Sequence, residues 1–318
     1  MQQLNYSTAL GGLYYACFCY RTTGFIGSAV VRELLGAGHH VVGLARSDKS
    51  AEALTAAGVE VHRGNLHDLD SLKAGAEASE GVIHTAFNTD FNNFDETTNF
   101  IDTAEADRRA IETLGEALAG TNRPLVVTSG TALLRPGRLA MEEDPMDSQS
   151  FAALRIPSEE TALSFAQRGV RVSVVRPPLS VHGKGDHGFI PALINLAQTR
   201  GFSAYVGKGS NRWSAVHLLD LAHLFRLALE KDPAGARLHG VGEEAIPFQN
   251  IANVIGQRLE VPVKAISSEE ADEHFGFLAA MVKMDNPASS TWTQEQLGWS
   301  PVQPGLIADI DQNYFTNS

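Results

Sequence analysis

The feature that most constrains this chain is a glycine-rich turn, Thr23-Gly24-Phe25-Ile26-Gly27, in front of an amphipathic segment that runs to Leu35. Gly36-Ala37-Gly38 ends that segment before the apolar run Val41-Val42-Gly43-Leu44-Ala45. A turn, a helix and a buried strand in this order are typical of a dinucleotide-binding βαβ unit. Glycines let the backbone approach a pyrophosphate, and a helix start offers unpaired N–H groups, so the turn predicts an anion site.

The alternation of strand-like and helical segments continues as far as about residue 178. Strand-like runs cover 59–62, 81–86, 124–128 and 170–176, and helix-period segments lie between them, notably at 104–118 and 158–167. This rhythm predicts an α/β fold, a Rossmann-type doubly wound parallel sheet with helices on both faces. After Pro177 the rhythm breaks, which predicts a smaller C-terminal substrate lobe. We expect the Rossmann domain at 1–178 and 213–232, and the lobe at 179–212 and 233–318.

Composition excludes several classes of protein. The chain has 318 residues, 43% of them hydrophobic, which is enough for a large core. Its net charge of −12 argues against nucleic-acid binding, and no apolar run is long enough for a bilayer. Cys17 and Cys19 are expected to point to opposite faces of a first strand, without a disulfide. Two cysteines without a disulfide scaffold favour a cytoplasmic protein.

An ordered set of short motifs carries a family resemblance. The motifs are Gly24-Phe25-Ile26-Gly27, Gly64-Asn65-Leu66-His67-Asp68, Val82-Ile83-His84-Thr85-Ala86, Arg176-Pro177-Pro178, Val181-His182-Gly183-Lys184-Gly185-Asp186, Val216-His217-Leu218-Leu219-Asp220 and Leu297-Gly298-Trp299-Ser300-Pro301. In this order the chain resembles the extended short-chain dehydrogenase/reductases, the NAD(P)-dependent epimerase/dehydratase family, from about residue 14 to its end. The resemblance implies a nicotinamide cofactor and a small substrate that carries a hydroxyl or carbonyl group.

The catalytic signature of that family is missing, which indicates an atypical member. The family uses Ser or Thr with Tyr-x-x-x-Lys, whereas the alignment puts Arg155 at the tyrosine and Glu159 at the lysine. Arginine stays protonated and is no general acid near neutral pH. Ser129 or Thr131 would then hold the substrate oxygen, with Arg155 as an electrostatic clamp on developing negative charge. The alternative is an i,i+4 salt bridge between Arg155 and Glu159.

The glycine motif also departs from the family at its first position, where Arg21 stands in place of glycine. A long side chain in this tight turn should crowd the cofactor. One interpretation is natural divergence that weakens cofactor binding. The other is a shifted reading frame up to about residue 21, because codons for Val-Thr-Gly read out of frame can give Cys-Tyr-Arg.

The resemblance assigns a set of cofactor-binding residues. They are Thr23, Gly24, Phe25, Ile26, Gly27, Arg46, Ser47, Asn65, Leu66, Thr85 and Ala86. Arg46 follows the second strand, where an acidic residue would bind the ribose of NAD and an arginine suits the 2′-phosphate of NADP. NADP is therefore the expected cofactor, with NAD as the second choice, and a solvated surface arginine is the alternative. Asn65 either meets the adenine or serves as a turn residue.

Three residues are expected to contact substrate, namely Asn88, His187 and Trp213. His187 lies in a glycine-rich loop with His182 and Asp186, for which a plain polar loop is the alternative. A zinc site would need a further ligand there, so no metal is predicted. His84 lies in an apolar run and is interpreted as a core histidine.

Two functions remain open at this point. The first is an NAD(P)-dependent oxidoreductase or epimerase/dehydratase-like enzyme acting on a small hydroxyl- or carbonyl-bearing molecule. The second is a catalytically silent NADP(H)-binding sensor, favoured by the missing Tyr and Lys. The family often forms homodimers through helices that match 104–118 and 158–167, so a homodimer is the expected assembly, with neither nucleic acid nor membrane as a partner.

Overall fold

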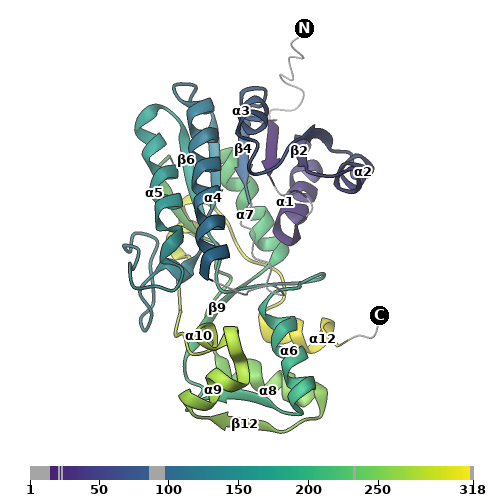
Figure 1. Ribbon diagram of the computed structural model, residues 1–318, viewed down its shortest axis with the longest axis vertical. Coiled ribbons are helices and arrows are strands. Elements are labelled where there is room, and N and C mark those ends of the chain that lie inside the picture. The colour runs from purple at the N-terminus through teal and green to yellow at the C-terminus, as the bar shows by residue number, and fades with distance from the viewer. Residues whose placement is uncertain (1–14, 21, 23, 86–96, 232–233, 316–318) are drawn as a thin grey trace.

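The computed structural model describes residues 15–20, 22, 24–85, 97–231 and 234–315. An upper lobe holds a seven-stranded parallel sheet in the order β10-β6-β5-β4-β1-β2-β3, and a smaller lobe lies below it (Figure 1). The predicted Rossmann-type α/β fold is confirmed. The strands of this sheet are β1 (Ala16–Tyr20), β2 (His40–Ala45), β3 (Glu60–Arg63), β4 (Gly81–His84), β5 (Pro124–Thr128), β6 (Arg171–Arg176) and β10 (Ala236–His239).

Helices cover both faces of this sheet, as a parallel sheet requires. Those of the upper lobe are α1 (Phe25–Gly36), α2 (Asp48–Ala56), α3 (Leu69–Glu77), α4 (Thr97–Leu118), α5 (Ile156–Ser164) and α7 (Leu218–Lys231). Helices α1 and α7 pack together on one face, and α3, α4 and α5 pack on the other. The apolar core therefore lies in two layers, one on each side of the strands.

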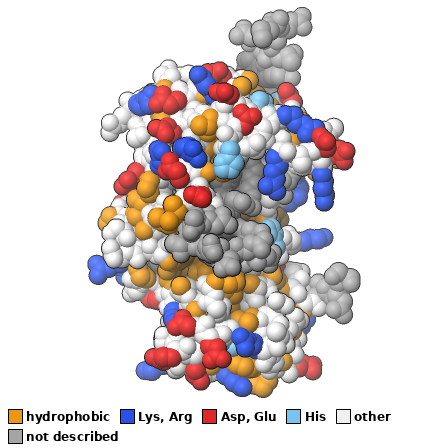
Figure 2. Space-filling model, in the orientation of Figure 1, with side chains coloured by type: hydrophobic (Ala, Val, Ile, Leu, Met, Phe, Trp, Pro, Cys, Tyr) orange, Lys and Arg blue, Asp and Glu red, His pale blue; other side chains and the backbone are white. Residues whose placement is uncertain are grey.

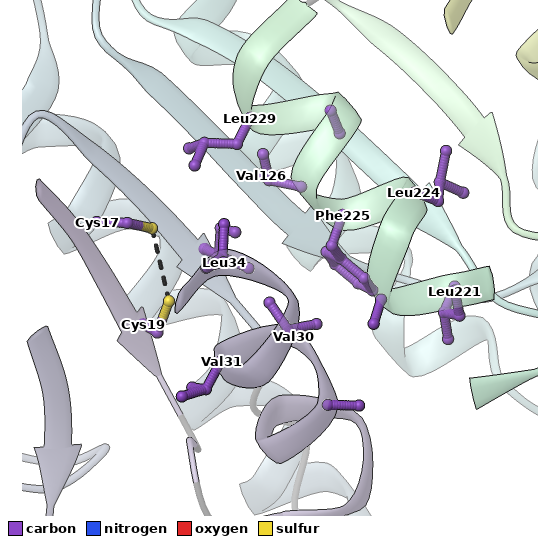
Figure 3. Close-up of a cluster of buried hydrophobic side chains, with 14 of the residues drawn as sticks. Cys17, Cys19, Val30, Val31, Leu34, Val126, Leu221, Leu224, Phe225 and Leu229 are labelled. Carbon is purple, nitrogen blue, oxygen red and sulfur yellow. Dashed lines mark hydrogen bonds between the residues drawn. The ribbon is translucent and has the colours of Figure 1, made fainter. Parts of the chain in front are cut away.

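Strand β1 shows how alternation divides side chains between these layers. Phe18 points to the layer of α3 and α4, while Cys17 and Cys19 point to the layer of α1 and α7 (Figure 3). The two sulfur atoms lie 3.5 Å apart, and both thiols are free and buried. The expectation that they face opposite sides was wrong, because residues two positions apart in a strand share a face.

The lower lobe is built from short elements around an aromatic core. Its strands are β7 (Ser180–His182), β9 (Arg212–His217) and β11 (Glu243–Pro247) in one sheet, with β8 (Ser203–Val206) and β12 (Val263–Ile266) in another. Its helices are α6 (Phe189–Arg200), α8 (Phe248–Leu259), α9 (Ser268–Phe275), α10 (Ala279–Val282) and α12 (Leu306–Asn313), while α11 (Thr291–Leu297) contacts α7. Trp213 and Phe248 pack edge to face, with ring centroids 5.0 Å apart.

The chain crosses between the lobes at other positions than we expected. Residues 236–239, which we assigned to the lower lobe, form β10 beside β6 in the main sheet. Residues 212–217, mostly assigned to the Rossmann domain, form β9 between β7 and β11. The partners of both strands lie far away in the chain, so local pattern does not reveal which sheet they join. None of the helices in the described ranges is both long and apolar enough to cross a membrane.

Candidate functional site

A cleft of about 670 Å³ lies at the carboxyl ends of the main strands, where the two lobes meet. Strands β1 and β4 are neighbours in the main sheet, and the chain leaves them toward opposite sides of the sheet. Open α/β sheets bind ligands at such a switch point. The lining comes from the start of α1, the ends of β4 and β5, the loop after β6, residues 186–190, and α10.

The first turn of α1 forms one wall of the cleft. Gly24 caps the helix in an extended conformation, and Ser28 N–H donates to its carbonyl at 2.8 Å. The N–H groups of Phe25, Ile26 and Gly27 precede that bond, so they have no acceptor within their own helix. These residues and Thr85 line the cleft together. The turn therefore fits a pyrophosphate, while Thr23 and Ala86 of the expected cofactor set lie outside the described residues.

Four other members of the cofactor set lie beside the cleft, outside its described lining. Arg46 is exposed at the end of β2, and the Ser47 hydroxyl caps α2 by accepting from Ser50 N–H at 3.2 Å. Asn65 Oδ1 accepts from His67 N–H at 2.8 Å, which is the turn role, and Leu66 packs against the sheet core. Arg46 and Ser47 remain candidates for a ribose phosphate, because they flank the strand end next to β1.

Arg155 lines the cleft and is held by three acceptors. Its guanidinium donates to the carbonyls of Thr128 at 2.8 Å and Ser129 at 3.3 Å, and it lies 3.7 Å from Asp107 Oδ2. Burial lowers the pKa of Arg155, and the charges of Asp107 and Glu159 oppose that shift. Ser129 lines the cleft beside it. Two of the three expected catalytic residues thus meet at the end of β5.

Thr131, the third of them, lies away from the cleft lining. It is fully buried, and its hydroxyl donates to Asn286 Oδ1 at 3.0 Å. Asn286 returns a bond to the Thr131 carbonyl at 3.2 Å. The expectation that Thr131 holds a substrate oxygen is therefore corrected, because this hydroxyl is engaged with a residue far along the chain.

Asp107 is a site residue that the sequence reasoning missed. It is fully buried on α4 and pairs with His84 Nε2 at 2.8 Å. Burial raises the pKa of Asp107, but His84 and Arg155 lower it further, so the carboxyl stays below its usual range. The signal was present, because Asp107 shares the helical face of the buried Ile111 and Leu114. His84 is a core histidine, as interpreted.

Glu159 is also buried, and it forms ion pairs with arginines on strands β6 and β10. Arg176 binds it with two nitrogens, at 2.5 and 3.1 Å, and Arg237 Nε lies 3.0 Å away. Burial raises the pKa of Glu159, and the two arginines more than offset this, so the group stays ionised. The expected Arg155–Glu159 pair is thus replaced by Arg155–Asp107 and Glu159–Arg176. A fully buried arginine such as Arg176 requires a carboxylate partner.

The expected substrate residues have different fates. His187 lines the cleft, and its ring lies edge-on to Phe25 with centroids 5.7 Å apart. Asn88 lies outside the described residues. Trp213 is only 1% exposed and donates from Nε1 to the Met281 carbonyl at 3.1 Å, so its placement against substrate is corrected. A large aromatic side chain between two lobe helices packs as core.

The loop that carries His187 is fastened to the end of the chain. Asp186 Oδ2 accepts from the Tyr314 hydroxyl at 2.6 Å, and Asp186 Oδ1 accepts from Gly188 N–H at 2.7 Å. His182, at the start of this loop, pairs with Asp309 at 2.7 Å. Across the described residues no group of three His, Cys, Asp or Glu side chains is arranged to hold a metal.

Comparison with known proteins agrees with this geometry. The profile of the NAD-dependent epimerase/dehydratase family matches residues 22–239. The chain belongs to this family. This family is NAD-dependent, and the predicted resemblance is confirmed.

Relatives of this epimerase/dehydratase-family protein occur in two yeasts. It is 48% identical to an uncharacterised protein of Saccharomyces cerevisiae, covering 94% of this chain and 99% of that one. It is 50% identical to an uncharacterised protein of Schizosaccharomyces pombe, covering 92% and 97%. A ketoreductase of a farnesylated dihydroquinoline oxide from Stigmatella aurantiaca is 27% identical over 67% of this chain and 64% of its own.

A solved structure shares the fold of this family member. The dTDP-glucose 4,6-dehydratase of Streptomyces venezuelae, crystallised with NAD and TYD, has a TM-score of 0.75 at 18% identity. The match covers 93% of this chain and 95% of that one.

Proposed function

We propose that this epimerase/dehydratase-family protein is an NADP(H)-dependent oxidoreductase acting on a hydroxyl- or carbonyl-bearing small molecule. One observation carries the proposal: the helix start of α1 and the Ser129–Arg155 pair line the same cleft. A pyrophosphate site and a site for a polarised oxygen are the two requirements of hydride transfer to or from a nicotinamide. The ketoreductase and sterol dehydrogenase relatives support the same reaction class.

In this proposal Ser129 and Arg155 have different roles. The nicotinamide supplies or accepts the hydride. The buried Ser129 hydroxyl, which interacts with Glu159, would turn to the substrate oxygen and orient it, and the Arg155 charge would stabilise the negative charge that develops there. Asp107 and the backbone carbonyls of Thr128 and Ser129 hold the guanidinium at the edge of the cleft. An arginine does not release its proton, so water or another ionisable residue of the cleft would supply the alcohol proton.

The proposed reaction is tested with Ser129→Ala, since Ser129 is buried and lines the cleft. We expect NADPH-dependent reduction of a panel of ketones and aldehydes, and a loss of at least about tenfold in kcat for Ser129→Ala. Ser164→Ala is the matched control, because that exposed hydroxyl bonds only within its own helix. Cofactor binding without turnover on any panel member would contradict the enzyme and favour the sensor.

The preference for NADP(H) rests on Arg46 and Ser47 at the end of β2. An arginine donates to a 2′-phosphate, and this strand end carries no acidic residue before Asp48. We expect Arg46→Ala to weaken NADPH binding by about tenfold or more and to leave NADH binding within about twofold. Equal affinities of the wild type for both nucleotides would reject this assignment.

The sensor remains the second candidate because Tyr and Lys are absent from the aligned positions and Arg155 is paired with Asp107.

A cytoplasmic location and a homodimer through α4 and α5 complete the proposal. The free thiols of Cys17 and Cys19 support a reducing compartment. Helices α4 and α5 pack against each other on the same face of the main sheet, and this face is the proposed dimer interface.

A further inference from the structure

The cleft has a second part, next to Arg155, whose walls are apolar. The upper lobe contributes Phe100, Phe151 and Leu154, and the lower lobe contributes Phe277, Ala280 and Met281. Three of these side chains are exposed to an unusual degree, with Phe151 at 45%, Leu154 at 42% and Phe277 at 45%. Figure 2 shows hydrophobic side chains gathered around the waist between the lobes. Exposed apolar side chains that gather in one cleft are typical of a binding site.

The charges in the cleft argue against a nucleotide sugar in this part. Among the described lining residues Arg155 is the one Lys or Arg, and its guanidinium already meets two carbonyls and Asp107. A second diphosphate would need further cationic donors. The remaining charged lining residue is the acidic Asp186, which would repel a phosphate if ionised. The apolar walls instead match a hydrocarbon, which needs no polar partner.

We propose that the substrate is a ketone or secondary alcohol with an alkyl or prenyl chain of several carbons, and that the chain lies between Phe151, Leu154 and Phe277. This inference rests on the proposed function and names its substrate class. The oxygen-bearing end would face Ser129 and Arg155, because these residues line the polar end of the same cleft. The chain would extend from there toward the exposed aromatic side chains at the mouth.

A homologous series of methyl ketones tests the proposal by binding, independently of turnover. We would titrate the full-length protein with 2-butanone, 2-hexanone, 2-octanone and 2-decanone in a calorimeter, with and without NADP⁺, which has no hydride to give to a ketone. Full burial of each added methylene tightens binding about fourfold, so affinity should rise steeply along the series. dTDP-glucose is the comparison ligand, and it should bind more weakly than 2-decanone.

Two variants and two matched controls test which side chains contact the hydrocarbon chain of the ligand. In Leu154→Ala and Phe277→Ala the ratio of 2-decanone affinity to 2-butanone affinity should fall at least about fivefold. Leu219→Ala and Val302→Ala remove exposed side chains outside the cleft lining, 47% and 77% exposed, and should keep the wild-type ratio. Circular dichroism verifies that each variant is folded.

The outcomes separate this inference from the proposed function. Chain-length-dependent binding without any turnover would retain the hydrocarbon site and contradict the oxidoreductase. If short ketones are turned over but ketone affinity does not depend on chain length, the hydrocarbon site is overturned and the oxidoreductase is retained. Absence of ketone binding, together with a dimer that Phe151→Ala dissociates in sedimentation, would show that a second copy covers the wall and would also overturn it.

Discussion

At the scale of single residues, Asp107 joins three elements around the cleft. It lies on α4, accepts from His84 at the end of β4, and lies 3.7 Å from Arg155 ahead of α5. Its pKa is held below the usual range, so it carries a negative charge at neutral pH. That charge balances the guanidinium of Arg155, whose side chain is 13% exposed. A buried charge that loses its partner is far more costly than the pair is stabilising.

Replacing Asp107 by asparagine should therefore lower the free energy of unfolding by about 3 kcal/mol. Urea denaturation of Asp107→Asn, Arg155→Met and the double variant measures the coupling, and the double variant should lose less than the sum of the single losses. Asp102→Asn is the matched control on the same helix, since Asp102 is exposed and should change stability by less than about 0.5 kcal/mol. Strict additivity of the two changes would contradict the pairing.

At the scale of elements, close contacts between helices decide where a methyl group fits. Gly115 on α4 faces the ring of Phe165, which follows α5, and a Cβ there would overlap the ring. Gly36 at the end of α1 has no atom within 4 Å of the same position. The two glycines are both helical, so the same substitution separates packing from helix propensity.

Gly115→Ala should destabilise the protein by about 1–3 kcal/mol, because the helices must move apart. Gly36→Ala should stabilise it by about 0.5–1 kcal/mol through helix propensity alone. Thermal unfolding of both variants under identical conditions gives the two signs. A stabilised Gly115→Ala variant would mean that α4 and α5 do not pack in this way.

Strand β10 carries a buried group that makes stability depend on pH. Burial, assisted by the positive charge of Arg176, lowers the pKa of His239 to about 4, and its Nδ1 donates to the Ser289 carbonyl at 2.7 Å. In the unfolded chain the histidine takes up a proton near its ordinary pKa of 6.5. Its contribution to stability is thus complete above that pH and is lost as pH falls toward 4.

Between pH 7 and pH 5 the wild type should lose about 2 kcal/mol of stability because of the lowered pKa of His239. His239→Asn keeps an amide donor for Ser289 and does not titrate, so its stability should change less over the same interval. Urea unfolding at both pH values measures the difference. The exposed His67 provides the control, since His67→Asn should retain the wild-type pH dependence.

At the scale of the whole molecule, the chain end fastens a wall of the cleft. Tyr314 follows α12 and binds Asp186, while Asp309 on α12 binds His182, so both ends of the loop that carries His187 are anchored. Tyr314 also accepts from Gly183 N–H at 3.2 Å. The lower lobe therefore holds the loop that faces the start of α1.

Tyr314→Phe should cost about 1–2 kcal/mol of stability, because it leaves the half-buried Asp186 without its hydroxyl donor. Amide hydrogen exchange at Gly183 and Gly188 should speed up more than exchange in the main sheet, and NADPH should bind more weakly. Tyr205→Phe is the control, since Tyr205 packs in the lobe with its ring half-buried. Unchanged exchange at both glycines would show that the loop is held by other contacts.

Local sequence patterns predicted two parts of the structure correctly, the main sheet and the first turn of α1. The alternation of apolar runs with helical segments predicted the parallel sheet, and the glycine turn predicted a helix start at the cleft, because both depend on residues close together in the chain. Strands β9 and β10 were misplaced, since their partners lie far away in the chain and are chosen by tertiary packing.

The sequence by itself determined the family and the strand–helix order of the main sheet, since both are written in neighbouring residues. Only the tertiary structure decided that Arg155 pairs with Asp107, that Glu159 belongs to Arg176, and that Trp213 is core. The physical reason is that a buried charge takes the partner that folding brings closest. Spacing along one helix does not reveal that partner.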